Sequence, residues 1–246
     1  MTELMIAVTI LGLAMAGVVT FTYQALNTYY YDSGRLLVNH DMRKFTGDMA
    51  TDAVFSNYFR IYPNFATRTT TVSGVTTDAA VRDGQSGDFL VLVFTNPRSE
   101  LDSGKATVSE LIGYYRDPAD PAHPDSSLGP VRRFDVFINP NVMIGDTTNT
   151  GASPPVYTMY DLLDLYQPTA NAHTNSRVIQ LAQGLSNGTL FYNFLDRSIM
   201  IKGQIQEQGN LVKRAVNTYN FTVSLRRTRK SGPLHRPEQL SQGRRA

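Results

Sequence analysis

Cysteine and tryptophan are both absent from this chain of 246 residues. Without cysteine the chain has no disulfide framework, no thiolate metal site and no cysteine nucleophile. The redox compartment stays open, because a cysteine-free chain tolerates an oxidising or a reducing one. Hydrophobic residues make up 41% of the chain and charged residues 18%, which excludes a disordered protein and one with many membrane spans. We therefore expect one or two domains around a hydrophobic core.

Positive charge is scarce outside the C-terminal end. Residues 226–246 hold seven of the 23 basic residues and one of the 21 acidic residues. The rest of the chain has 16 basic and 20 acidic residues, a net charge of −4. This distribution excludes a basic surface spread over the fold, so we expect no nucleic-acid partner. Residues 228–246 lack apolar periodicity, and we expect them to form a flexible, solvated basic tail.

Charged residues are absent from residues 4–21, where Thr9 and Thr20 are the polar side chains. As a helix this segment would extend for about 27 Å, close to the thickness of the hydrocarbon layer of a membrane. A cleavable secretory signal would have a basic start and a small-residue cleavage site, whereas Glu3 precedes the segment and Thr22 follows it without a break. The segment is therefore predicted to be a retained membrane-spanning helix.

Proline is absent before Pro63, so nothing interrupts a helix from Thr2 to Ile61 except glycines such as Gly34 and Gly47, which a helix tolerates. Beyond the apolar segment, apolar residues recur every three or four positions and charged residues fill the other faces. This pattern predicts that the second part of the helix is amphipathic and packs on a globular domain. The stripe consists of Val38, Met42, Phe45, Met49 and Ala53, and it continues to Phe59.

After Pro63 the pattern changes to short runs of β-forming residues. Eight strands are predicted: Thr69–Val75, Phe89–Phe94, Leu111–Tyr115, Val131–Ile138, Arg177–Ala182, Thr189–Phe194, Ser198–Gln206 and Ala215–Leu225. Turn residues at Asn187-Gly188 and at Gln208–Asn210 lie between the last strands and predict that the C-terminal half forms an antiparallel meander. A short helical segment is predicted at Met159–Tyr166. The fold class is therefore α+β, with a long N-terminal helix (residues 1–62) packed on an antiparallel β-sheet head (residues 63–227).

The sequence TELMIAVTILGLAMAGVVTF at positions 2–21 places a single acidic residue before an uninterrupted apolar run. This segment resembles the N-terminus of type IV pilins and type II secretion pseudopilins, and the resemblance covers the first 25 residues closely. The runs Met42–Met49, Gly87–Val93 and Leu190–Asp196 are similar to those of the larger minor pseudopilins of the J or W kind. In this family the glutamate is normally the fifth residue after a leader has been removed. We therefore expect the leader and two mature residues to precede Met1.

The resemblance implies that Glu3 and Leu4 act in filament assembly, that the prepilin peptidase and the inner-membrane assembly machinery are partners, and that the N-terminal amine is methylated. A physical argument also favours a role of Glu3 in assembly, because a carboxylate at the start of a membrane helix is costly unless a cation pairs with it. The amine of a neighbouring subunit is one candidate, and a solvated N-terminal carboxylate on an ordinary anchor is the alternative. Gly12 and Ala16, with Gly17 beside them, favour close approach of another helix.

Catalytic and metal-binding patterns are few. Gly184–Gly188 fits the G-x-S-x-G pattern of hydrolases, but the following strand-like run indicates a hairpin turn instead. The four histidines are far apart in sequence, which gives no zinc-site pattern. Asp117, Asp120 and Asp125 share a loop. Oxygen-rich loops can bind calcium, but the pattern is more typical of acidic residues in a solvated loop. We therefore expect no enzymatic activity and no cofactor.

The expected function is that of a structural subunit, in a minor or tip position, of a type IV pilus or type II secretion pseudopilus. The alternatives are the major subunit of such a fibre and a membrane-anchored extracytoplasmic binding domain. We expect the chain to reside first in the bacterial inner membrane, with a single span and the head in the periplasm or outside. After assembly it would belong to an extracellular or periplasmic filament whose other subunits are its partners.

Overall fold

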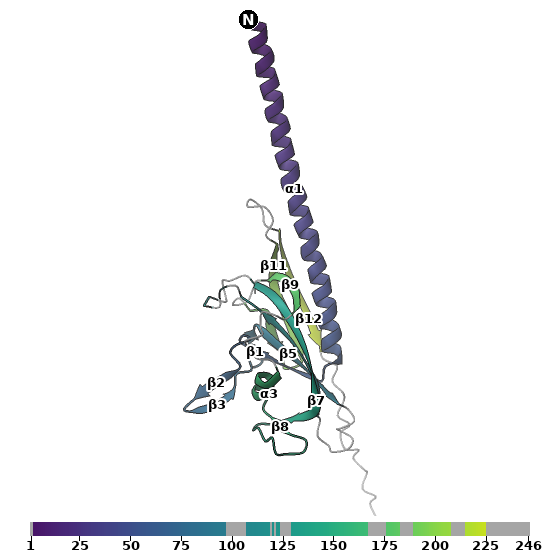
Figure 1. Cartoon of the computed structure of the whole chain (residues 1–246), viewed down its shortest axis with the longest axis vertical. Coiled ribbons are helices and arrows are strands. Elements are labelled where there is room, and N and C mark those ends of the chain that lie inside the picture. The colour runs from purple at the N-terminus through teal and green to yellow at the C-terminus, as the bar shows by residue number, and fades with distance from the viewer. Residues whose placement is uncertain are drawn as a thin grey trace, which may run out of the picture.

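The chain forms a long helical rod whose C-terminal half carries a β-rich head (Figure 1). In this computed structural model the described residues are 2–96, 107–118, 120, 122–123, 129–166, 176–182, 189–207 and 215–224. A long N-terminal helix with sheets that are mainly antiparallel confirms the predicted α+β class. The predicted tail, residues 228–246, and the boundary at residue 227 lie outside the described residues.

Helix α1 (Thr2–Phe55) has 54 residues, which corresponds to a rod of about 81 Å. It ends at Phe55, so the prediction of a helix to Ile61 was wrong at its C-terminal end. The Ser56 hydroxyl donates to the carbonyl of Ala53, and the Asn57 N–H donates to the carbonyl of Val93. The backbone is therefore diverted into strand β1 (Tyr58–Tyr62), which contains both Phe59 and Ile61.

Three sheets make up the rest of the head. The six-stranded sheet has the order β1-β5-β6-β7-β8, and β9 also pairs with β7. The four-stranded sheet has the order β12-β11-β10-β4, and β2 and β3 form a separate hairpin. The remaining bounds are β2 Thr69–Val72, β3 Val75–Asp78, β4 Ser86–Gly87, β5 Phe89–Asn96, β6 Thr107–Arg116, β7 Gly129–Ile144, β8 Val156–Tyr157, β9 Ser176–Ala182, β10 Phe191–Phe194, β11 Ser198–Glu207 and β12 Ala215–Ser224. Helix α3 (Met159–Tyr166) confirms the predicted short helix.

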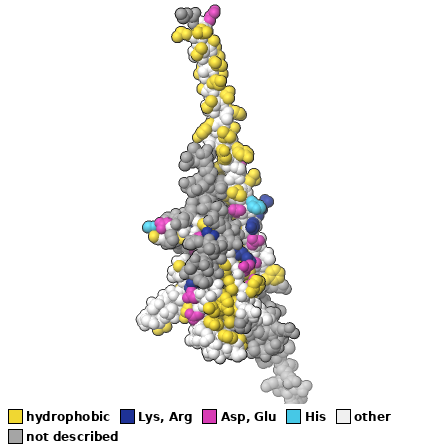
Figure 2. All heavy atoms as spheres, in the orientation of Figure 1, with side chains coloured by type: hydrophobic (Ala, Val, Ile, Leu, Met, Phe, Trp, Pro, Cys, Tyr) yellow, Lys and Arg dark blue, Asp and Glu magenta, His cyan; other side chains and the backbone are white. Residues whose placement is uncertain are grey.

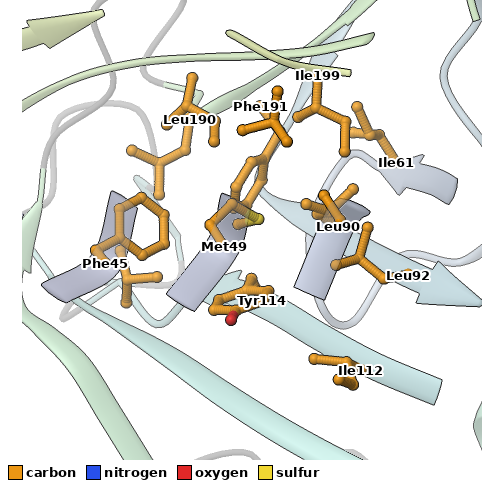
Figure 3. Close-up of a cluster of buried hydrophobic side chains, with 14 of the residues drawn as sticks. Phe45, Met49, Ile61, Leu90, Leu92, Ile112, Tyr114, Leu190, Phe191 and Ile199 are labelled. Carbon is orange, nitrogen blue, oxygen red and sulfur yellow. The ribbon is translucent and has the colours of Figure 1, made fainter. Parts of the chain in front are cut away.

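The core occupies both faces of the six-stranded sheet. On one face, Leu90 and Leu92 of β5 meet Phe45 and Met49 of α1 and Phe191 of the four-stranded sheet (Figure 3). On the other face, alternate residues of the same strand pack with side chains that include those of α3. Because both faces are covered, residues 89–93 are all buried, which explains why this run is apolar without alternation.

Two strand predictions were wrong in detail. The predicted single strand Thr69–Val75 is a hairpin, because Ser73 and Gly74 adopt positive φ angles of 53° and 80° and reverse the chain. Strand β9 pairs with β7 and not with β10, so it is not part of the predicted meander. The meander itself is confirmed for β10, β11 and β12. The predicted turn residues Asn187-Gly188 and Gln208–Asn210 lie outside the described residues.

A buried ion pair joins the two larger sheets. Asp88, which follows β4, accepts hydrogen bonds from Nε and Nη2 of Arg116 in β6 at 2.7 and 2.5 Å. Its other carboxylate oxygen accepts from the N–H of Leu190, next to β10, at 2.9 Å. The Arg116 side chain is 0% exposed and that of Asp88 is 6% exposed. The neighbouring Gly87 lets β4 pass close to β1, since a Cβ there would lie 2.1 Å from the carbonyl oxygen of Tyr62.

Candidate functional site

The N-terminal part of α1 exposes apolar side chains on every side. The large apolar side chains between Leu4 and Phe21 are 59–74% exposed, with Ile6 and Met5 at the two limits. None of the most apolar stretch is buried against the rest of the chain. Figure 2 shows this part as a rod covered by hydrophobic atoms and extending beyond the head. In the described part of the chain, α1 is the helix long and apolar enough to cross a membrane.

Polar side chains in this part of the helix hydrogen-bond to the helix itself. The hydroxyls of Thr9, Thr20 and Thr22 donate to the carbonyls of Met5, Ala16 and Val18, each at 2.8 Å. A hydroxyl bonded in this way carries no unsatisfied donor into an apolar environment. Lipid or other helices can therefore surround the segment without the free-energy cost of burying an unbonded threonine hydroxyl.

Glu3 lies in the first turn of α1 and is exposed. The positive end of the helix dipole favours a carboxylate at this position. Among the described residues, Glu3 forms no ion pair. Neighbouring Leu4 is 73% exposed. Both predicted assembly residues are thus available for contacts outside the described part of the chain.

The small residues Gly12 and Gly17 have no packing role within the described chain. A Cβ added to either glycine would meet nothing within 4 Å. Gly12 and Ala16 lie four residues apart on one side of α1, whereas Gly17 lies about 140° from Gly12 around the axis. Ala16 and the buried Gly34 are separated by 18 residues, or about five full turns. The side with Gly12 and Ala16 therefore continues the face of α1 on which the head sits.

The amphipathic half of α1 behaves as its periodicity predicts. Its buried residues are Gly34, Val38, Phe45, Met49 and Ala53, and Met42 is partly buried against them. The same helix thus changes from a fully exposed apolar segment to one face of a core. The apolar segment can enter a membrane while the head stays in water.

The remaining sequence candidates form no recognisable reaction centre. Gly184–Gly188, Asp125, His173 and His235 lie outside the described residues. Asp117 is buried and accepts a 2.5 Å hydrogen bond from Nε of Arg132, and Asp120 lies 2.9 Å from the ring of His123. His40 and His123 are exposed. No group of three potential metal ligands occurs among the described residues.

A groove of about 630 Å³ lies beside strand β1. It is lined on one side by Asn57 and Arg60 and on the other by Arg197, Ser198 and Ser224. The hydroxyls of Ser198 and Ser224 are 2.9 Å apart. Sequence reasoning missed this groove because β1 was predicted to be helical. It is the feature of the head on which a binding role would rest.

A fragment that starts at Asn27 is expected to be soluble without detergent and to keep the β-rich fold of the head. It lacks the exposed apolar segment but keeps every buried residue of α1, all of which lie from Gly34 onward. Circular dichroism and size-exclusion chromatography of the fragment and the full chain would test this. Aggregation of the fragment, with a full chain that is soluble without detergent, would contradict the role of residues 4–21 as the apolar anchor.

Comparison of the chain with known protein families, with curated proteins and with solved structures finds no match.

Proposed function

We propose that this chain is a structural, non-enzymatic subunit of a fibre of the type IV pilus or type II secretion pseudopilus kind, in a minor or tip position. The observation that supports it most is the division of one continuous helix. In its N-terminal part the large apolar side chains are 59–74% exposed and point in all directions. Its C-terminal part contributes one face to the hydrophobic core. An anchor alone needs about 20 apolar residues, whereas here the same rod continues into the head without a break.

In this proposal the apolar segment passes from lipid into a bundle of subunit helices. Its threonine hydroxyls are already bonded within the helix, and its glycines have free space around them. Gly12 and Ala16 face the side of α1 that carries the head, so a helix packed on them would lie directly below the head. The head stays outside the bundle, and its size and loops favour a minor or tip subunit over a major one. The pilin-like head, the partners and the filament location belong to this proposal.

A membrane-anchored binding domain is the second candidate, and the groove beside β1 favours it. The two functions differ in a simple property of the intact chain. A binding domain would be monomeric in detergent and absent from fibres, whereas a fibre subunit would copurify with them. The abundance of the chain in purified fibres would also separate a minor from a major subunit.

Replacing Glu3 with Ala is expected to leave membrane insertion intact and to lower incorporation into fibres at least about tenfold. Insertion persists because the change removes a charge that is costly in a membrane. Incorporation falls because a carboxylate paired with a neighbouring amine in an apolar setting is weakly screened, and about 1.4 kcal/mol already corresponds to a factor of ten. The ratio of the chain in sheared fibres to the chain in membranes measures the effect.

Two further substitutions at the same position serve as controls. Glu3→Asp keeps the charge and is expected to retain part of the incorporation, while Glu3→Gln keeps the shape and is expected to lose it. Normal incorporation of Glu3→Gln would rule out pairing by charge. Absence of the unmodified chain from fibres would overturn the proposed function itself.

A further inference from the structure

The part of α1 between the apolar segment and the head is rich in tyrosine. Tyr23, Tyr29 and Tyr30 are 51–68% exposed, and Tyr31 is partly buried. Four of the 13 tyrosines of the chain thus lie between residues 23 and 31, a stretch without any charged residue. Tyrosine is enriched where a membrane helix leaves the hydrocarbon layer, because its ring is apolar and its hydroxyl is polar. We call these four residues the tyrosine belt.

The positions of the belt match the layers of a membrane. The 20 helical residues from Leu4 to Tyr23 extend for about 30 Å, the thickness of the hydrocarbon layer. The polar layer beyond it is about 5–7 Å thick on each side. The Cα of Tyr30 lies about 10 Å beyond Tyr23, but helical side chains lean about one turn towards the N-terminus. The Tyr30 ring therefore reaches back into the polar layer, and the next charged residue, Asp32, lies at its aqueous edge.

Arg35 brings a cation back to the same level. Its side chain is exposed, and its Cζ lies 6.0 Å from the centre of the Tyr31 ring, one turn nearer the N-terminus. The guanidinium therefore points along the helix towards the apolar segment. Asp32 is only three residues away, yet Arg35 forms no ion pair within the described residues. A guanidinium placed in this way can bind the phosphate of a phospholipid through two N–H groups.

We propose that residues 23–35 of α1 bind the headgroup layer of a phospholipid membrane, with the tyrosine belt at its boundary with the hydrocarbon and Arg35 at the phosphates. Lipid is favoured over a protein partner because the surface continues directly from the apolar segment and changes with depth from apolar to aromatic to charged. This contact is independent of the proposed function, since a fibre subunit before assembly and an anchored binding domain would both make it.

The head then begins at the membrane surface without a spacer. Gly34, the first buried residue of α1, lies three residues after Tyr31 and directly before Arg35. The head therefore starts within one turn of the tyrosine belt. Because α1 is continuous from the apolar segment into the head (Figure 1), the tilt of the helix in the membrane also sets the tilt of the head.

Because the chain has no tryptophan, single introduced tryptophans can report depth in the membrane without background. Leu13→Trp places the probe at the middle of the apolar segment, Tyr30→Trp in the belt, and Phe55→Trp at the end of α1. All three replace exposed side chains. Each full-length variant is reconstituted at low density into phosphatidylcholine vesicles. These vesicles carry either a nitroxide on the headgroup or bromines near the ends of the acyl chains.

Tyr30→Trp is expected to be quenched at least about threefold more by the headgroup nitroxide than by the acyl-chain bromines, and Leu13→Trp in the opposite order. Phe55→Trp is the matched control, because it lies on the same helix about 38 Å beyond Tyr30 and should be quenched by neither. If Tyr30→Trp behaved like Phe55→Trp, the belt would lie in water or under protein, and the proposal would be overturned. Stronger quenching of Tyr30→Trp by the acyl-chain bromines would show a longer span and overturn it as well.

The contact of Arg35 with phosphate is tested by lipid preference. Thr28→Trp is the probe, since Thr28 is exposed on the face of α1 that carries Arg35, about two turns nearer the apolar segment. Phosphatidylglycerol brominated at the upper end of its acyl chains is expected to quench it at least about twofold more than phosphatidylcholine brominated there, because anionic lipid attracts a nearby basic side chain.

Adding Arg35→Ala is expected to remove this preference, and adding Arg35→Lys to retain it. Arg43→Ala is the matched control, since Arg43 is exposed on the same helix but about 12 Å further from the membrane, and it should leave the preference unchanged. Absence of a preference in Thr28→Trp itself, or a preference that survives Arg35→Ala, would overturn the contact of Arg35 with phosphate.

This proposal and the fibre function fail in different ways. Absence of headgroup quenching from Tyr30→Trp, in a chain that enters fibres, would overturn the membrane contact alone. Headgroup quenching of Tyr30→Trp in a chain that never enters fibres would support the contact and overturn the fibre function.

Discussion

The replacement of Asp88 with Ala is expected to lower the free energy of unfolding of the head by about 3–5 kcal/mol. The substitution leaves the guanidinium of Arg116, which is 0% exposed, without the carboxylate that accepts two of its hydrogen bonds. It also leaves the buried N–H of Leu190 without its acceptor. Removing one partner of a buried ion pair typically costs this much, because the other charge stays buried.

The effect is measurable as a fall of about 6–20 °C in the thermal midpoint, since 1 kcal/mol corresponds to about 2–4 °C in a domain of 150–250 residues. Near-ultraviolet circular dichroism of the tyrosines would follow the unfolding of the full chain in detergent. The double substitution Asp88→Ala with Arg116→Met is expected to recover part of the loss. Asp120→Ala, which removes an exposed carboxylate facing His123, is the control and should change the midpoint by less than about 2 °C. A small effect of Asp88→Ala would show that the two sheets are held together without this pair.

Phe45→Ala is expected to destabilise the head by about 3–5 kcal/mol through the loss of a fully buried ring and the cavity that it leaves. The ring of Phe45 makes edge contacts with Tyr114 of β6 and Phe221 of β12, with centroids 5.9 Å apart in both cases. Figure 3 shows it with Met49 among the buried side chains that α1 shares with both sheets. The substitution thus weakens the attachment of the helix to each of them.

Phe55→Ala on the same helix is the matched control. Phe55 is 70% exposed, so its removal is expected to change stability by less than about 0.5 kcal/mol. Urea unfolding of the Asn27 fragment, provided that it folds as expected, would compare the two variants at equal helix content. Similar effects of both substitutions would mean that α1 is not held to the head by its buried stripe.

The periodicity of α1 predicted its packing well, since Val38, Phe45, Met49 and Ala53 are all at most 2% exposed. Periodicity works here because burial repeats with each turn of a helix. The end of the helix was missed because Phe59 and Ile61 continue the apolar pattern. The helix ends where the N–H of Asn57 donates a hydrogen bond to the carbonyl of Val93 in β5. A local sequence pattern cannot predict a partner so distant in the chain.

The predicted assembly residues and the exposed Phe137 of β7 differ in the same way. Glu3, Gly12 and Ala16 are visible in the sequence because they interrupt or vary an apolar run. Phe137 stands within the run Val136–Ile138 and reads as a core residue, yet it is 75% exposed. The pairing of β7 with β6 puts it opposite Glu110, which is itself only partly buried. Such pairings depend on the tertiary fold and are not encoded in spacing.

Strand β12 is synthesised last among the described strands, and until it forms the chain is prone to aggregate. Phe221 and Val223 belong to the core that covers the buried face of α1, yet they are made long after it. At usual rates of synthesis, the stripe from Val38 to Ala53 waits about 10–30 s for this strand. During that interval the apolar part of α1 has already been made, so an incomplete chain exposes both that segment and the uncovered stripe. The order of synthesis therefore favours a chaperone, or a low local density of nascent chains, while the head folds.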